Sequence, residues 1–400
     1  MKLAFAFLLI VFLAFSGYHL TFRRFRMPFY ARPFSITGSE FLFLGLLLGP
    51  WFLNILDREA QKELFFLHAF LLGWIGLIFG FQFELAKLRR FPRGYVFAAI
   101  TEGTLSFVLI FGVIQLTACL FPGAGNVVHM GDALVLGAVG ACTAQTGIAL
   151  VASGHGPKFG KLVLLLRCIS SIGPLVPLVS FGLFFSFGKV SAANLWWLSE
   201  VGNGFIILLG SCLGLVLLLA FFLKEPRQES ELILLLLSTV TLGSGLSSVL
   251  GMSPLFFTFL LGLFLVNMSR EKERLYQILI TVEKPAYVLL LVLLGANWRL
   301  YSIWVPVLAV AYCVYRGIVK VGAGAIATRI AGTAGERLPG LSGLGLLHQG
   351  GLSLAMLLDF QRGFSSSGTS WVVSLVLIGV LLNDIMGLFL TERLLRNATP

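Results

Sequence analysis

Apolar stretches long enough to cross a lipid bilayer follow one another along almost the whole chain, separated by short polar segments. A membrane-spanning helix needs about 20 consecutive apolar residues, and lipid tolerates no exposed, unpaired backbone. With 58% hydrophobic and 12% charged residues, a soluble domain could not cover its own surface. The pattern predicts an all-α polytopic membrane protein with about thirteen transmembrane helices. The predicted spans are 3–20, 36–56, 64–83, 94–121, 132–152, 162–187, 201–223, 232–250, 254–269, 277–297, 301–328, 340–358 and 370–391.

The first apolar stretch resembles a signal peptide, but its charges fit a retained helix better. Lys2 is the only charge before the apolar run, and Arg23, Arg24 and Arg26 follow it like the flank of a stop-transfer segment. We therefore expect an extra N-terminal transmembrane helix over residues 1–33, followed by one transmembrane domain over residues 34–400.

Most of the 29 Lys and Arg residues fall in every second loop, for example in 87–93 and 270–274. Basic loops face the cytoplasm, so this alternation places the N-terminus outside and the C-terminus in the cytoplasm of a multi-pass cell-membrane protein. The net charge of +11 is then explained by the bilayer, and no nucleic-acid partner is expected.

Two predicted spans contain small and polar residues at their middle. The fifth reads GDALVLGAVGACTAQTGIALVASG, and the twelfth reads LSGLGLLHQGGLSLAMLLD. Transporters built from inverted repeats use paired broken helices of this kind around a site at the bilayer midplane. The fourth to sixth and eleventh to thirteenth spans would be the two repeats. The alternative is that Gly and Thr only allow close helix packing.

From residue 37 to the end, a series of motifs resembles the monovalent cation:proton antiporter superfamily, the sodium/hydrogen exchanger domain. These motifs, in chain order, are FLFLGLLLGP, GLIFGFQFELAKLRR, LGAVGACTAQTGIAL, LGMSPLFFTFLLGLFLVN, YVLLLVLLGANWRL, YCVYRGIVKVGAGAIATRIAG, GLGLLHQGGLSLAM and LLNDIMGLFLTERLL. The resemblance implies a dimer-forming panel packed on a unit with two crossed broken helices. It also implies a homodimer that exchanges Na⁺, K⁺ or another monovalent cation for protons by alternating access.

The sixth span departs from this family, which usually carries Asp there. Its sequence KLVLLLRCISSIGPLVPLVSFG contains no acid, and Ser170 and Ser171 are the polar residues in the expected window. A carboxylate can hold either a cation or a proton, whereas a serine hydroxyl does not exchange protons near neutral pH. The fifth span differs too, because Gln145, between Thr143 and Thr146, stands where the family often has Pro. We therefore expect an atypical ion site.

Other acids are candidates for the missing carboxylate. Glu102 lies inside the fourth span, where it would be either a displaced ion site or one half of a buried ion pair. Asp384 resembles a family position near the cytoplasmic end of the last span, with a helix-packing hydrogen bond as the alternative. Asp359 is expected at the outer surface, and Glu283 with Lys284 is expected to form a surface pair at the start of the tenth span.

Arg316 matches a buried basic residue of the family's eleventh span. Its partner would be Glu102, Asp384, helix C-terminal carbonyls or a bound anion. Lys320, one turn further on, is expected to extend to the cytoplasm. His348 and Gln349 lie in the second interrupted span, where His348 is either a titrating group or a packing residue.

The sequence contains no Walker loop, zinc-type His/Glu spacing or other enzyme signature, so we expect no enzyme, cofactor or metal centre. Three functions stay open: an exchanger with an atypical site, a non-transporting or sensor protein of the same fold, and a transporter of an anion or neutral solute. A carboxylate at the two helix breaks would favour the first.

Overall fold

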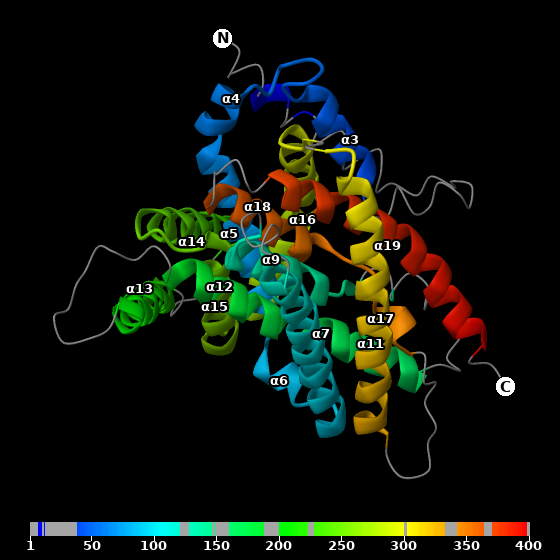
Figure 1. The fold of residues 1–400 in the computed structure, drawn as a ribbon. Coiled ribbons are helices and arrows are strands. Elements are labelled where there is room, and N and C mark those ends of the chain that lie inside the picture. Colours follow the sequence, from blue (N-terminus) through cyan, green and yellow to red (C-terminus); the bar gives the residue numbers. More distant parts are fainter. Residues whose placement is uncertain are drawn as a thin grey trace.

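The described residues of the computed structural model are helices joined by turns and short extended segments (Figure 1). They cover 7–9, 12, 38–120, 128–145, 148, 160–187, 200–222, 228–299, 302–332, 342–363 and 370–397. The helices are α3 (Ser39–Leu48), α4 (Arg58–Glu63), α5 (Phe65–Phe81), α6 (Leu85–Leu88), α7 (Arg93–Leu120), α9 (Met130–Ala141), α11 (Gly160–Ile172), α12 (Leu175–Phe187), α13 (Glu200–Phe222), α14 (Glu229–Val249), α15 (Pro254–Met268), α16 (Lys272–Ala296), α17 (Val305–Ala331), the 3₁₀ helix η2 (Ser342–Leu346), α18 (Gly351–Gly363) and α19 (Ser370–Asn397).

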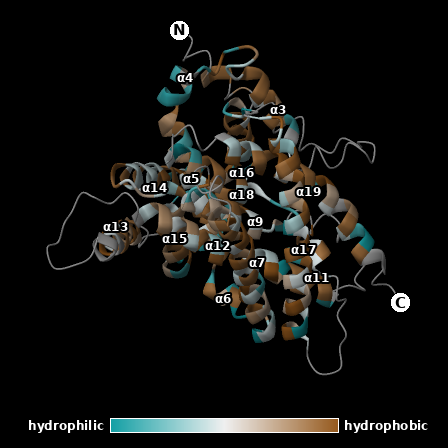
Figure 2. Ribbon diagram, viewed as in Figure 1, coloured by the Kyte–Doolittle hydropathy of each residue, from teal (hydrophilic) through white to brown (hydrophobic). Residues whose placement is uncertain are grey.

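Six apolar segments among the described residues are long enough to cross a bilayer, and shorter apolar helices accompany them. Large side chains on their outer faces, such as Phe66, Val249 and Ile318, are exposed as lipid-facing residues would be. Figure 2 shows this apolar character along the helices, with α4 as a hydrophilic exception. The chain is therefore an all-helical protein of polytopic membrane type. The predicted first span, 3–20, lies outside the described residues except at 7–9 and 12.

Some boundaries differ from the predicted spans because local chemistry ends the helices. The second span was predicted to reach residue 56, but α3 ends at Leu48 and Gly49 is extended. Pro50 explains this, since a residue before proline avoids the helical region. The sixth span is interrupted between α11 and α12, where Pro174 has no N–H to continue the ladder.

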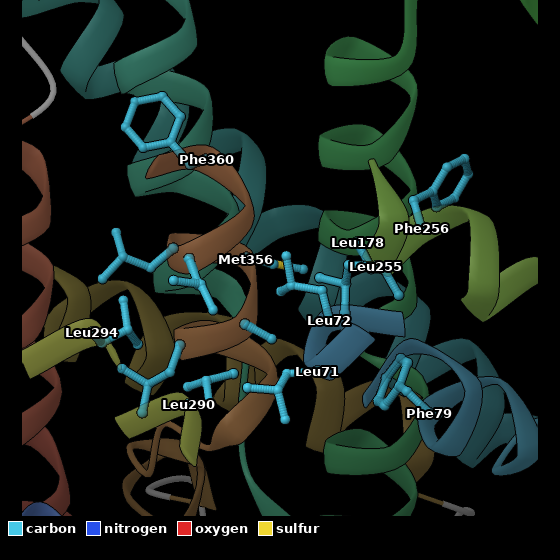
Figure 3. Close-up of a cluster of buried hydrophobic side chains, with 14 of the residues drawn as sticks. Leu71, Leu72, Phe79, Leu178, Leu255, Phe256, Leu290, Leu294, Met356 and Phe360 are labelled. Carbon is cyan, nitrogen blue, oxygen red and sulfur yellow. The ribbon is translucent and has the colours of Figure 1, made fainter. Parts of the chain in front are cut away.

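Five helices, α3, α5, α14, α15 and α16, pack together and are called the panel here. Helix α5 lies closest to α15, because Gly76 and Gly80 leave no side chain between the backbones: a Cβ at either position would lie 2.3 Å from a backbone oxygen of α15. Figure 3 shows apolar side chains of α5, α12, α15, α16 and α18 gathered in the buried cluster that joins the panel to the rest of the molecule.

The remaining packed unit, called the bundle here, consists of α7, α9, α11, α12, α17, η2, α18 and α19. Helices α7 and α17 lie side by side, with α9 packed on α7 and η2 packed on α17 (Figure 1). Each of the series α7–α9–α11 and α17–η2/α18–α19 therefore consists of a long helix, an interrupted segment and a further helix. This arrangement brings the two interrupted segments together at the centre of the molecule.

Candidate functional site

The two interrupted segments touch where each loses its helical form. Helix α9 ends at Ala141 and continues as irregular backbone over 142–144, while 347–350 is irregular between η2 and α18. The N–H of Ala144 donates to the carbonyl of His348 (2.9 Å), and the hydroxyl of Thr143 donates to the carbonyl of Leu346 (3.1 Å). A Cβ on Gly350 would lie 2.7 Å from that of Ala144. The two breaks therefore form one buried crossing of free backbone groups.

Arg316 binds the carbonyl ends at this crossing. Its Nε, Nη1 and Nη2 donate to the carbonyls of Gly140 (2.8 Å), Leu347 (2.7 Å) and Cys142 (2.9 Å), and its side chain is fully buried. These carbonyls carry the partial negative charge of helix C-termini, which a guanidinium compensates. Of the partners considered from the sequence, helix C-terminal carbonyls are therefore the ones observed.

Glu102 pairs with Lys320 instead. The Nζ of Lys320 lies 2.8 Å from the Oε1 of Glu102, 2.9 Å from the hydroxyl of Thr143 and within hydrogen-bond distance of the Ala141 carbonyl. Ser106 donates a further hydrogen bond to Oε1 of Glu102 (3.0 Å). The expectation that Lys320 extends to the cytoplasm is wrong. Its side chain is fully buried, because Glu102 and the end of α9 offer it partners at membrane depth.

Glu102 also lies close to the part of the sixth predicted span where the resembled family usually has Asp. A Cβ built on Gly173 would lie 3.2 Å from the Oε2 of Glu102, and one on Gly103 would lie 2.3 Å from the carbonyl oxygen of Gly173. Two facing glycines thus let α7 approach the junction of α11 and α12 closely. As a result, a carboxylate from the fourth predicted span reaches the window 168–174, which has no acid of its own.

Asp384 belongs to the second break. Its Oδ1 accepts the backbone N–H of Gln349 (3.0 Å) and lies 3.9 Å from the Nδ1 of His348. The side chain of Gln349 donates to the carbonyl of Val139 (2.9 Å) and accepts from Asn383 (3.2 Å). Gln349 therefore links α9, the second break and α19, and Asp384 places a buried carboxyl group beside them.

The serines of the sixth span make local bonds. Ser170 and Ser171 donate to the carbonyl of Arg167 (3.1 and 2.8 Å), and the amide of Gln145 donates to the hydroxyl of Ser171 (2.7 Å). Gln145, where the resembled family often has Pro, thus links the first break to α11. Thr146 lies outside the described residues.

A cavity of about 440 Å³ lies between the bundle and the panel. Thr143, Gln145, Ser170, Gln349 and Asp384 are the predicted site residues on its wall. Glu102 and Arg316 lie behind that wall, linked to it through Thr143 and Cys142.

Two further charged residues on this wall, Glu283 and Lys284, come from α16 of the panel. The expectation that they lie at the start of a span is wrong, because α16 begins at Lys272 and they lie near its middle. The basic residues at 270–274 were a signal for the earlier start, since positive charges flank the cytoplasmic ends of spans.

No protein-family model matches the chain, and no curated protein matches it. Among solved structures, the chain is similar to the sodium proton antiporter MjNhaP1 from Methanocaldococcus jannaschii, with a TM-score of 0.63, 20% sequence identity and 98% of each chain covered. That protein is a transporter rather than an enzyme. At this identity the likeness concerns the fold alone. The chain described here therefore has the fold of a sodium/proton antiporter over almost its whole length.

Proposed function

We propose that this protein is a secondary transporter that exchanges a monovalent cation, Na⁺ or K⁺, for protons through an atypical ion site. The observation that carries the proposal is the position of Asp384, a buried carboxylate that contacts a helix break and lines the cavity. A carboxylate there can bind a cation or a proton but not both, and this competition couples the two fluxes.

The other polar groups at the crossing supply oxygen ligands for a cation and neutralise the buried charges around it. Thr143, Gln145 and Gln349 bring oxygen atoms to the same wall, and such oxygens can replace part of the hydration shell of a cation. Arg316 and Lys320 compensate the carbonyl ends of the breaks, and Glu102 balances Lys320. Asp384 then remains as the acid on the cavity wall of the bundle.

The same contacts disfavour an anion transporter. Arg316 donates to three backbone carbonyls and Lys320 pairs with Glu102, so these two buried cations, which are the ones among the described residues of the bundle, already have partners. A sensor without transport would be favoured by an apolar, closed crossing. Instead, a cavity with polar side chains and a carboxylate on its wall reaches this crossing.

The proposal includes the finer topology expected from the sequence: thirteen spans, two inverted repeats with crossed broken helices, an external N-terminus and a homodimer. The similar order of elements in α7–α9–α11 and α17–η2/α18–α19 supports the repeats. The alternation of basic loops supports the orientation.

Transport by purified protein in proteoliposomes tests the function. A pH-sensitive dye inside the vesicles should respond when Na⁺ or K⁺ is added, with Li⁺ as a further probe. Asp384→Asn should abolish the response, because the amide cannot take up a proton. Asp57→Asn is the matched control and should keep it, since Asp57 caps α4 away from the cavity and Asn caps helices equally well. A dye that responds to no cation, or an active Asp384→Asn protein, would contradict the proposal.

A further inference from the structure

Glu283 and Lys284 lie near the midpoint of a membrane-spanning helix. Helix α16 runs from Lys272 to Ala296, so Glu283 is about 17 Å from its first residue at about 1.5 Å per residue. A charge inside a membrane-spanning helix is costly in lipid and normally faces a water-filled space or a partner. Both side chains are exposed and line the cavity, and Pro285 follows directly, so the helix ladder is also interrupted at this level.

The two charges belong to the wall opposite the helix breaks. Asp384 and Gln349 line the cavity from the bundle, whereas Glu283 and Lys284 line it from the panel. An ion that reaches Asp384 through this cavity passes between the two walls. Fixed charges on a cleft wall change the local concentration of ions of opposite sign, by tenfold or more when screening is weak.

We propose that Glu283 is a specificity-determining residue that selects cations on their way to the helix breaks, and that the neighbouring Lys284 limits this attraction. The proposal rests on the cation exchange proposed above. It identifies the residue of the panel wall of the cavity that attracts the cation. Glu283 acts on the entry of the cation and not on the proton exchange itself. Its charge therefore sets the cation concentration needed for half-maximal transport, and Lys284 acts with the opposite sign.

Paired neutral substitutions measure this effect. In proteoliposomes at low ionic strength, Glu283→Gln should raise the KM for the cation about tenfold, and Lys284→Gln should lower it. The maximal rate should stay close to that of the unchanged protein in both variants. Adding choline chloride should shrink both shifts, because salt screens charges beyond about 10 Å at 0.1 M.

Two further variants distinguish an effect of the Glu283 charge from a general loss of structure. Glu283→Asp keeps the charge and should restore most of the KM. Glu273→Gln is the matched control on the same helix, because Glu273 pairs with Lys87 and does not line the cavity. Its KM should not move.

The outcomes distinguish the two proposals. Exchange with an unchanged KM in Glu283→Gln overturns the role of Glu283 and leaves the exchanger intact. Shifts of reversed sign would mean that the transported species is an anion, which overturns cation selection. A wild-type protein that exchanges no cation overturns both.

Discussion

At the residue scale, the Glu102–Lys320 pair is the most constrained ionic contact in the bundle. Both side chains are buried, and the Lys320 ammonium has three hydrogen-bond partners: Glu102, Thr143 and the Ala141 carbonyl. Removing two charges from water is costly, and their attraction compensates only where such additional bonds exist. The pair therefore stabilises the bundle only while both members are present.

Removing either member should leave the other charge buried without its partner. Glu102→Gln or Lys320→Met alone leaves an uncompensated buried charge and should lower the free energy of unfolding by about 3 kcal/mol or more. The double variant should lose less than the sum of the single losses, with a coupling of roughly 1–3 kcal/mol. Thermal unfolding in detergent measures all three.

The control for this cycle is the pair Lys87–Glu273, whose atoms are 3.3 Å apart with side chains 47% and 65% exposed. Surface pairs of this kind contribute about 1 kcal/mol or less, so Glu273→Gln should change the unfolding temperature little. Additive losses for Glu102 and Lys320 would contradict the pair as described.

The sequence locates charged candidates inside the predicted spans but leaves their partners open. Glu102, Arg316 and Asp384 stand out because charges inside apolar stretches are rare. Their depth along a helix follows from their position in the span, but the rotation of each helix about its axis does not. Lys320 was therefore assigned to the cytoplasmic interface by its depth, although α17 turns it toward Glu102.

At the element scale, the close approach of α7 to the junction of α11 and α12 places Glu102. Gly103 faces the carbonyl of Gly173 with no room for a side chain, since an added Cβ would be 2.3 Å from that oxygen. This contact decides whether the carboxylate of the neighbouring residue reaches the sixth-span window. The sequence shows both glycines, but not that they face each other.

Gly103→Ala should push α7 away from this junction. Because the obstacle is backbone and not a flexible side chain, we expect a loss of about 1–3 kcal/mol in the free energy of unfolding. Exchange in proteoliposomes should fall as well, since Glu102 moves with the helix. Gly112→Ala, on the same helix with nothing within 4 Å of the added Cβ, should be neutral or slightly stabilising. Equal effects of the two substitutions would contradict the close contact.

The position of α16 shows why a span start could not be read from hydropathy. Hydropathy marks the part of a helix that lies in lipid, and the polar turns at 272–276 extend beyond it. The predicted start at residue 277 therefore placed Glu283 and Lys284 near an end of the span. The observed helix begins at Lys272 instead, and Glu283 and Lys284 lie on the cavity wall.

At the scale of the whole molecule, the cavity and a polar contact cluster lie at opposite ends of the same helices. Arg362 donates to the hydroxyl of Ser248 (2.6 Å) and lies 4.1 Å from the ring centroid of Phe65, and Ser253 donates to Asp359. This cluster, called the latch here, joins the end of α18 to the panel. The expectation that Asp359 sits at the outer surface is wrong in one respect, because the packing of α18 on α15 buries it.

The latch lies at the ends of α5 and α18 that are remote from the cavity. Helix α18 begins at the cavity with Gly351 and ends at the latch, and α5 begins at the latch with Phe65 and ends at the cavity beside Gln82. Under the exchange proposed above, each side of the protein opens in turn, so the latch contacts would have to break in the other state. Weakening the latch contacts should favour the state that is open on the latch side, without changing the residues of the ion site.

Arg362→Gln tests this step. Hydrogen bonds to charged groups contribute about 1.5–3 kcal/mol, so their loss should shift the ratio of the two states by roughly tenfold or more. Gln145→Cys in a Cys119→Ser background places an accessible thiol on the cavity wall. Labelling by a membrane-impermeant thiol reagent should accelerate from the latch side and slow from the cavity side when Arg362 is neutralised. Arg329→Gln, which removes an exposed arginine from the last turn of α17, should change neither rate. If Arg362→Gln also left both rates unchanged, the latch would be a static packing contact, because a gate cannot lose its charged hydrogen bonds without altering the access of water to the cavity.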